Sequence, residues 1–228
     1  MQYIKDLKFG YIIFYSSQCL FSIKQNMSKV DPDRIWKVYS NIKTMLKARG
    51  FKGINMLGRD ELVECVTTPG FCRHRLDCIV DAKLMLFFCD VSKRPKIGVV
   101  VIRNALEKMV NRGIKNAMFI LKSNLTSQGL SAIREVNASG YAIEYFNDRD
   151  LYFNITEHEL ASPHRIITEE ETTSLLEKYK TTLAYLPKIY DSDPMAKYYG
   201  AKVGQVVEIT RLTETAGHSL YYRTVISG

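Results

Sequence analysis

The chain has 228 residues, of which 46% are hydrophobic and 25% are charged, and its formal net charge at pH 7 is +8. This balance is typical of a globular protein and excludes a chain that is disordered throughout. The length is enough for one large or two small domains, and the positive charge favours an acidic or polyanionic neighbour.

Residues 1–26 differ from the rest of the chain. Their apolar and aromatic run, GYIIFYSSQCLFSI, is flanked by lysines. Ser16, Ser17 and Gln18 interrupt this run, which is too short to span a bilayer and lacks the small-residue cleavage site of a signal peptide. We therefore expect residues 1–26 to be an N-terminal extension, either disordered or the product of a non-native start, that contributes nothing to the fold.

The cysteines indicate a reducing compartment, either the cytosol or the nucleus, because they are odd in number and irregularly spaced. They are Cys19, Cys65, Cys72, Cys78 and Cys89. Three of them lie near His74, but a zinc site normally has paired C-x₂₋₄-C elements, which this segment lacks. We expect buried thiols here, with no metal and no other cofactor.

The first predicted helix begins after Asp31, a residue that can cap a helix whose first position is proline. Apolar residues then recur at helical spacing until Gly50 ends the pattern. A shorter helical turn is predicted near Arg59. Strand-like apolar runs follow at Leu76–Val80 and Leu84–Cys89.

Helices and strands alternate in the next part of the chain. A helix is predicted from Val101 to Asn111, then a strand at Ala117–Leu121. Another helix begins at Thr126 or Ser127, and the run YAIEYF from Tyr141 reads as a further strand. This alternation indicates an α/β layer.

The domain boundary is predicted at Asp148 to Tyr152, which gives a first domain over residues 27–150 and a smaller, β-rich domain over residues 151–228. In the second domain, Thr168 and Glu171 form a T-x-x-E capping box that opens a helix. The remaining predicted elements are a short helix from Asp193 to Gly200 and two hairpin strands, at Gln205–Arg211 and Leu220–Ile226. The predicted fold class is therefore α+β.

An enzyme is a weaker interpretation of the sequence. Asp77, Asp81 and Lys83 resemble the residue types of a metal-dependent nuclease, but such a site needs carboxylates that converge on a divalent ion, and both aspartates lie on one short run. His158 is flanked by glutamates, yet the zinc motif H-E-x-x-H would need histidine where Ser162 stands. No serine or cysteine nucleophile with a base is visible, so we expect no catalytic residue.

Two segments near the C-terminus carry the most specific patterns. They are NITEHELASPHRIITEEE from Asn154 and LPKIYDSDPMAKYYGAKVGQVVEITRLTETAGHSLYYRTV from Leu186. In order and spacing they resemble the C-terminal assembly domain of the fifth common subunit of eukaryotic DNA-directed RNA polymerases I, II and III, a domain that has a counterpart in archaeal RNA polymerase. A looser likeness upstream, through RIWKVYSNIK, RGF and RDEL, extends over most of residues 27–228.

The resemblance implies a non-catalytic structural subunit of nuclear RNA polymerase. Its second domain would anchor to the largest subunit near the small shared subunits, with no membrane contact. The positions that the family motif assigns to partner binding are Thr156, Glu157, His158, Glu159, Leu160, Arg211, Glu214, Thr215, Tyr222 and Arg223.

The resemblance also implies a jaw-like first domain, similar to nuclease folds but without their active site, that flanks downstream duplex DNA without reading its sequence. The residues expected nearest to DNA are Lys122, Thr126 and Ser127. The family's Thr-Pro-Ser-Ala turn here reads TSQG, so its proline is lost. Capping of a helix by Thr126 is an equally good interpretation of this turn.

Three further departures from the family pattern lie in the tail. Leu212 stands where proline is usual, Glu208 where a basic residue is common, and His218 where arginine is common. The last two reduce the positive charge and are compatible with an isoform assigned to one polymerase, such as polymerase I in the nucleolus. The other hypotheses are a free-standing nucleic-acid enzyme and a module that recruits transcription factors through the jaw.

Overall fold

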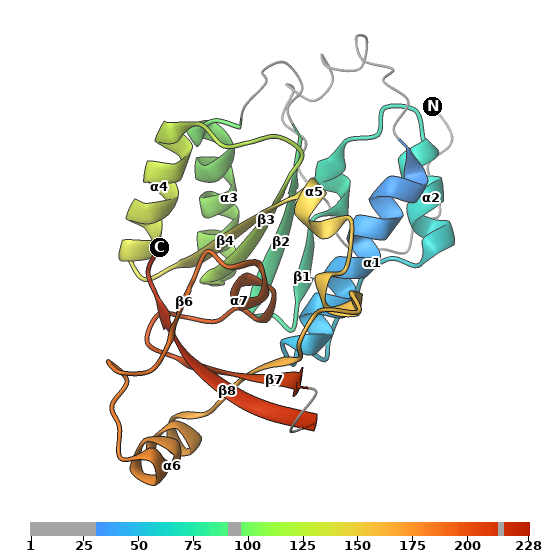
Figure 1. The fold of residues 1–228 in the computed structure, drawn as a ribbon. Helices are drawn as coiled ribbons and strands as arrows, with labels where there is room; N and C mark the ends of the chain where they lie inside the picture. The colour runs from blue at the N-terminus through green and yellow to red at the C-terminus, as the bar shows by residue number, and fades with distance from the viewer. Residues whose placement is uncertain (1–30, 91–96, 214–216) are drawn as a thin grey trace, which may run out of the picture.

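The computed structural model describes residues 31–90, 97–213 and 217–228, and its fold is α+β (Figure 1). The extension predicted for residues 1–26 lies outside the described residues. The described part of the chain forms two four-stranded sheets, with the strand orders β1-β2-β3-β4 and β5-β7-β8-β6. Across that part, no helix is long and apolar enough to span a membrane.

The first sheet is built by the chain up to residue 147, with β2, β3 and β4 parallel and β1 antiparallel to β2. Helices connect the parallel strands, as the predicted alternation requires. The elements are α1 (Pro32–Ala48), α2 (Arg59–Thr67), η2 (Arg73–Leu76), β1 (Cys78–Val80), β2 (Leu84–Cys89), α3 (Val99–Arg112), β3 (Asn116–Leu121), α4 (Ser127–Ala138) and β4 (Ala142–Asn147).

Helices cover both faces of this sheet: α1 and α2 lie on one side, and α3 and α4 on the other (Figure 1). In β2, Leu86 and Phe88 pack in the core with α1, whereas Phe87 and Cys89 pack in the core with α3. All six residues of β2 are buried, because a parallel strand covered on both faces has no polar side.

Two predicted elements in this half begin two residues away from the predicted position, and other boundaries differ by one residue. The strand predicted at Leu76–Val80 begins at Cys78, because the preceding residues wind into the 3₁₀ helix η2. The helix predicted from Val101 begins at Val99. By contrast, the predicted cap of α1 is confirmed, since the Asp31 side chain accepts hydrogen bonds from two main-chain amides of the first turn.

The second sheet is mostly antiparallel, with only β6 parallel to β8. Short apolar cores form on its two faces, one with α7 and the other with α6. The sequence did not indicate the three-residue strands β5 and β6. The elements from α5 onward are α5 (Asp148–Leu151), η3 (Ile155–Glu157), β5 (His164–Ile166), α6 (Glu169–Tyr179), β6 (Lys188–Tyr190), α7 (Pro194–Tyr199), β7 (Val206–Thr213) and β8 (Gly217–Ile226).

Arg49, at the C-terminal end of α1, joins the two halves of the structure. Its Nε donates to the carbonyl of Tyr198 at 2.9 Å and its Nη2 to the carbonyl of Lys197 at 2.5 Å, both in the last turn of α7. The same Nη2 lies 2.9 Å from a carboxylate oxygen of Glu144 on β4, and the arginine side chain is only 8% exposed. A buried cation thus satisfies the carbonyls at the negative end of one helix and a carboxylate of the first sheet.

A second buried ion pair holds the chain where it leaves the first sheet. Arg73 in η2 and Asp148 at the start of α5 make two contacts of 2.8 Å, with side chains only 6% and 15% exposed. The planar guanidinium matches a carboxylate in this bidentate geometry. The pair therefore fixes the position from which the chain continues toward the second sheet.

Replacing Arg49 by methionine should lower the free energy of unfolding by about 3 kcal/mol, because Glu144 and the α7 carbonyls lose a buried partner. The control is Arg59→Met, which removes an exposed pair with Asp33, with side chains 62% and 72% exposed. That change should cost about 0–0.5 kcal/mol. Urea unfolding of both variants measures the difference, and equal losses would contradict the role assigned to Arg49.

Candidate assembly surface

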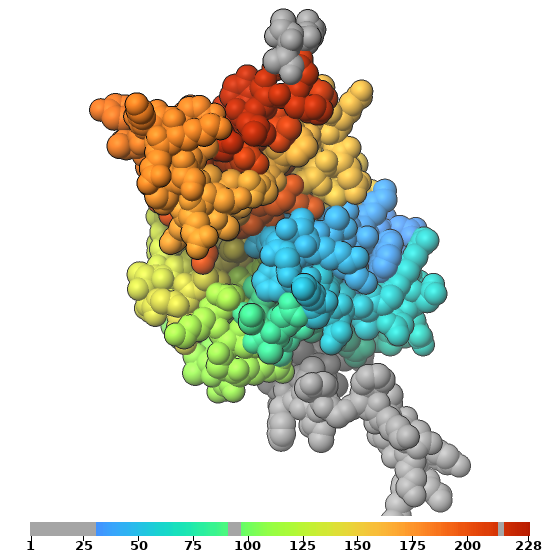
Figure 2. Space-filling view, turned by 90° about the horizontal axis from the view of Figure 1, so that it is seen from below, coloured from blue at the N-terminus to red at the C-terminus, as the bar shows by residue number. Residues whose placement is uncertain are grey.

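The β7–β8 hairpin exposes large apolar side chains along its outer half. Leu212 is 79% exposed, Leu220 is 55% exposed and Tyr221 is 43% exposed. Figure 2 shows the hairpin, in red, close to the orange segment that contains α6. Exposed apolar side chains of this kind mark surfaces for interaction with another protein, and here they lie on both faces of the hairpin.

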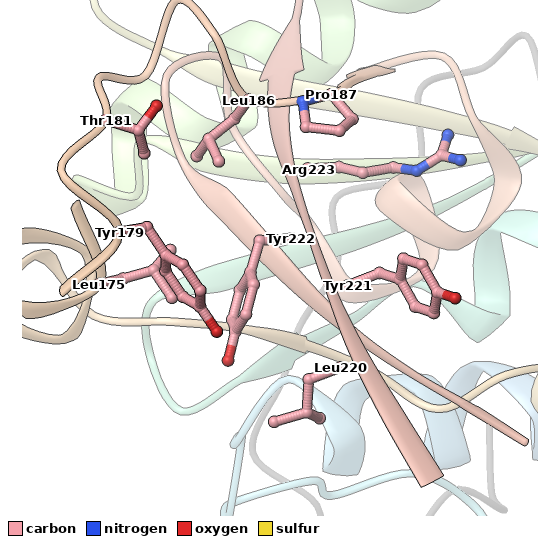
Figure 3. Close-up of a pocket in the computed structure, with 9 residues that line it drawn as sticks. All are labelled: Leu175, Tyr179, Thr181, Leu186, Pro187, Leu220, Tyr221, Tyr222 and Arg223. Carbon is pink, nitrogen blue, oxygen red and sulfur yellow. The ribbon is translucent and has the colours of Figure 1, made fainter. Parts of the chain in front are cut away.

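A pocket of about 400 Å³ lies beside β8 (Figure 3). Tyr179 projects into this region from α6 and is 58% exposed. The lining is mainly apolar and aromatic, which suits the side chains of a protein partner. The pocket is lined by Leu175, Tyr179, Thr181, Leu186, Pro187, Leu220, Tyr221, Tyr222 and Arg223.

A charged network borders this pocket on the face of the sheet covered by α6. Arg165 of β5 contacts Glu171 at 2.8 Å and Glu208 at 3.2 Å. Hydrogen bonds to Glu171 and then to Glu208 raise the pKa of Arg165 above its ordinary value. Glu208, where the family pattern favours a basic residue, therefore has a cationic partner within this chain. Burial raises the pKa of the adjacent Tyr222 hydroxyl, and the Glu208 carboxylate raises it further.

The two arginines predicted to bind partners differ in their surroundings. The guanidinium of Arg211 lies 5.1 Å from the ring centre of Tyr221, a cation–π geometry. Arg223 lines the pocket, and no carboxylate of the described residues forms an ion pair with it. Its positive charge is thus available to a partner.

The predicted segment Thr156–Leu160 forms a turn with hydrogen bonds among its own residues and those next to it. Asn154 accepts from the amide and the hydroxyl of Thr156, and its side chain donates to Glu157 at 2.8 Å. The Nδ1 atom of His158 accepts from the amide of Leu160 at 3.2 Å. Leu160 is 85% exposed, so the turn presents one apolar side chain that the fold does not use.

The structure brings some of the predicted partner-binding residues together and leaves others apart. Tyr222 and Arg223 line one pocket, whereas residues 156–160 do not contribute to it. Glu214 and Thr215 lie outside the described residues. Sequence analysis missed the contribution of Tyr179 and Pro187, although Tyr179 lies one helical turn after the buried Leu175 and on the same face of α6.

The turn predicted to lie near DNA follows β3. The Nζ of Lys122 lies 3.6 Å from an Asp90 carboxylate oxygen. Thr126 caps α4, because its hydroxyl accepts from the amide of Gly129 at 3.0 Å. Ser127, the first residue of α4, is exposed. The capping interpretation of Thr126 is therefore confirmed, and it leaves the first turn of α4 accessible.

The aspartates of the nuclease hypothesis serve different segments. Asp77 accepts from the amide of Phe88 at 2.8 Å, whereas Asp81 accepts from the amides of Lys52 and Gly53. Neither residue lies within the strand β1. Within the described residues, no group of three or more His, Cys, Asp or Glu side chains is placed to hold a metal ion. Both carboxylates are thus engaged in holding the backbone.

The thiols near that region are poorly reactive. Burial raises the pKa of Cys78 to about 12 and that of Cys89 to about 12, with the charge of Asp77 adding to both shifts. The thiolate is the form that acts as a nucleophile or as a metal ligand. These two side chains therefore behave as packing groups.

Comparison with known proteins identifies the family. The family model described as RNA polymerase Rpb5, C-terminal domain, matches residues 153–225. A Caenorhabditis elegans protein named DNA-directed RNA polymerases I, II, and III subunit RPABC1 is 31% identical over 207 residues, which cover 85% of this chain and 96% of the relative. The chain belongs to the Rpb5 family of RNA polymerase subunits. It is a non-catalytic member of the transcription machinery.

Two further relatives of the Rpb5 family carry the same name. The protein of Caenorhabditis briggsae is 31% identical over 207 residues, with 85% of this chain and 96% of the relative covered. The protein of Dictyostelium discoideum is 36% identical over 144 residues, which cover 63% of this chain and 72% of the relative. The family resemblance inferred from the two C-terminal segments is therefore confirmed.

The carboxylate of Glu171 gives the second sheet of this Rpb5 family member a predictable pH dependence. The hydrogen bond from Arg165 lowers the pKa of Glu171 below its ordinary value of 4.5. Because the folded-state pKa is the lower one, the stabilisation is complete above that ordinary value and is lost as the pH falls through the lowered pKa. Wild-type stability should therefore decline on acidification more steeply than that of Glu171→Gln.

Urea unfolding between about pH 6 and pH 3 measures this difference. The matched control is Glu170→Gln, which changes an exposed neighbour in the first turn of α6 that makes no ion pair within the described residues. Its pH profile should follow that of the wild type. A flattened profile for Glu170→Gln but not for Glu171→Gln would contradict the assignment.

Proposed function

We propose that the chain is a structural subunit of nuclear DNA-directed RNA polymerase. The observation that carries this proposal is the alignment of 207 residues at 31% identity with a relative named as a subunit of RNA polymerases I, II and III. The engaged aspartates of the first sheet agree with a structural rather than a catalytic role. A metal-dependent nuclease is the much weaker alternative.

The two sheets support a division into a jaw domain at residues 27–150 and an assembly domain at residues 151–228. Each sheet has cores of its own. Arg49 and the packing of Tyr198 against the core of α1 couple the two domains. We propose that this coupling holds the jaw, a nuclease-like α/β layer, in a fixed direction relative to the part that is anchored.

Anchoring would use the exposed apolar surface of the second domain. Leu160 and the hairpin residues Leu212, Leu220 and Tyr221 expose much of their apolar surface, and burial of such side chains drives subunit association. The partners would be the largest polymerase subunit and the small shared subunits. Recruitment of transcription factors by the jaw is compatible with this assignment.

The turn between β3 and α4 would lie beside downstream duplex DNA. The main-chain amides at a helix N-terminus and a nearby lysine suit contacts with phosphate, which position a protein on DNA without reading sequence. Lys122, Thr126 and Ser127 supply these groups at the start of α4. The lost proline in TSQG leaves this geometry in place, because Thr126 still caps the helix.

The subunit would act in the nucleus, either in all three polymerases or as an isoform of one of them. The Glu208–Arg165 pair, with a 3.2 Å contact, supports a surface whose charge differs from the common family pattern. An isoform of polymerase I would place the chain in the nucleolus. Affinity purification of the tagged chain from nuclear extract distinguishes these cases by the sets of large subunits recovered.

In the same purification, Leu160→Asp should reduce recovery of the largest polymerase subunit by about tenfold or more. The reason is that the apolar contact that Leu160 would bury against the partner is replaced by a charge. The matched control is Val100→Asp on α3, where the side chain is 69% exposed and lies far along the chain from the assembly domain. Val100→Asp should leave recovery unchanged. Failure of the wild-type chain to recover any polymerase subunit would refute the proposed function.

The DNA contact predicts a change in salt dependence. Polymerase that contains Lys122→Ala should bind downstream duplex DNA with a slope of log affinity against log salt that is smaller by about 1 than that of the wild type. Lys202→Ala, an exposed lysine of the assembly domain, is the control and should leave the slope unchanged. The measurement is a titration of purified polymerase with labelled duplex at several KCl concentrations; equal slopes for Lys122→Ala and the wild type would argue against phosphate contact.

A further inference from the structure

Strand β8 has one edge that is only partly used. It pairs with β7 over residues 217–224 but with β6 only over residues 224–226. The amide of Thr224 donates to the carbonyl of Pro187 at 2.8 Å, so the main chain of Thr224 faces the β6 edge. Successive residues of a strand direct their main-chain groups to opposite edges. The main-chain groups of Leu220 and Tyr222 therefore face this same edge, beyond the end of β6.

Nothing within the described residues pairs with these main-chain groups. The pocket described above lies directly beside them. It is lined by Leu220 and Tyr222, whose side chains lie on one face of the sheet, and by Tyr221 and Arg223, whose side chains lie on the other. Figure 3 shows these pairs on opposite sides of the strand. A pocket that side chains reach from both faces of one strand lies at the edge of that strand.

We propose that this open edge binds an extended segment of another polymerase subunit, which adds a strand to the second sheet in line with β6. The proposal rests on the proposed function, because the partner is taken to be a polymerase component. Unpaired amide and carbonyl groups on a strand edge are complemented by another polypeptide backbone, which offers donors and acceptors at the same repeat. A nucleic acid lacks this repeat.

The chemistry of the pocket specifies the segment further. Tyr179, Tyr222 and Leu220 present apolar surface next to the edge, so alternate side chains of the added strand would be apolar. Arg223 lines the same pocket, and no carboxylate of the described residues pairs with it. A glutamate or aspartate of the incoming segment would satisfy this charge. The expected partner is thus an extended segment that combines apolar and acidic residues.

Amide hydrogen exchange of the whole chain, free and within purified polymerase, tests the pairing directly. In the free chain, the amides of Leu220 and Tyr222 should exchange quickly, whereas those of Tyr221 and Arg223 are already paired with β7. Assembly should slow exchange at Leu220 and Tyr222 by about tenfold or more and leave the other two much less changed. Unchanged exchange at Leu220 and Tyr222 in a polymerase that contains the chain would overturn the proposal and leave the proposed function standing.

Two substitutions at one position separate main-chain from side-chain binding. Leu220→Pro removes an amide that faces the open edge, where proline is tolerated because no ladder hydrogen bond is lost. Leu220→Ala removes only the side chain. Retention of the chain in polymerase during salt washes should be about tenfold weaker for the proline variant than for the alanine variant. Equal retention of two folded variants would falsify strand addition; if the proline variant unfolds on its own, the exchange measurement decides.

Discussion

The guanidinium of Arg49 is the contact on which the relative placement of the two sheets depends. It lies at the end of α1 and is largely buried. It donates hydrogen bonds to two carbonyls of α7 and pairs with the carboxylate of Glu144. The backbone is shaped around it, since a Cβ at Gly200 would lie 3.0 Å from the Cζ of Arg49. Gly200 also has a φ of +70°, which favours glycine independently. Position 200 is therefore doubly constrained.

The two halves that Arg49 joins differ in how much of their apolar surface they bury. The first sheet is covered on both faces and has buried strands, so most of its apolar surface is used within the chain. The second sheet has small cores and leaves Tyr185 83% exposed and Leu212 79% exposed. A sheet that buries so little on its own leaves much of its apolar surface for association with other proteins. Arg49 and Tyr198 connect that surface to a rigid layer, so a force on one half is transmitted to the other.

The sequence was informative where structure is decided by neighbouring residues. The capping box of Thr168 and Glu171 and the cap provided by Asp193 act over three residues or fewer, and both were recognisable. The strands β5 and β6 were missed because each has only three residues and exists through pairing with distant partners, β7 and β8. The buried role of Arg49 was equally hidden, because an arginine near a helix end reads as a solvated side chain. For the candidate site, the motifs identified Tyr222 and Arg223, but only the fold shows that Tyr179 shares their pocket.

The position of β8 in the chain has a consequence for biosynthesis. β8 follows both β6 and β7 in the sequence, yet it lies between β7 and β6 in the sheet and is the sheet neighbour of both. Domains generally fold in order as the ribosome releases them, so the first sheet can form while the second still lacks its central strand. The segment from α6 to β7 must wait, with its apolar residues uncovered, until β8 leaves the exit tunnel. Emergence of β8 from the ribosome thus sets the moment at which the second half becomes competent to meet a partner.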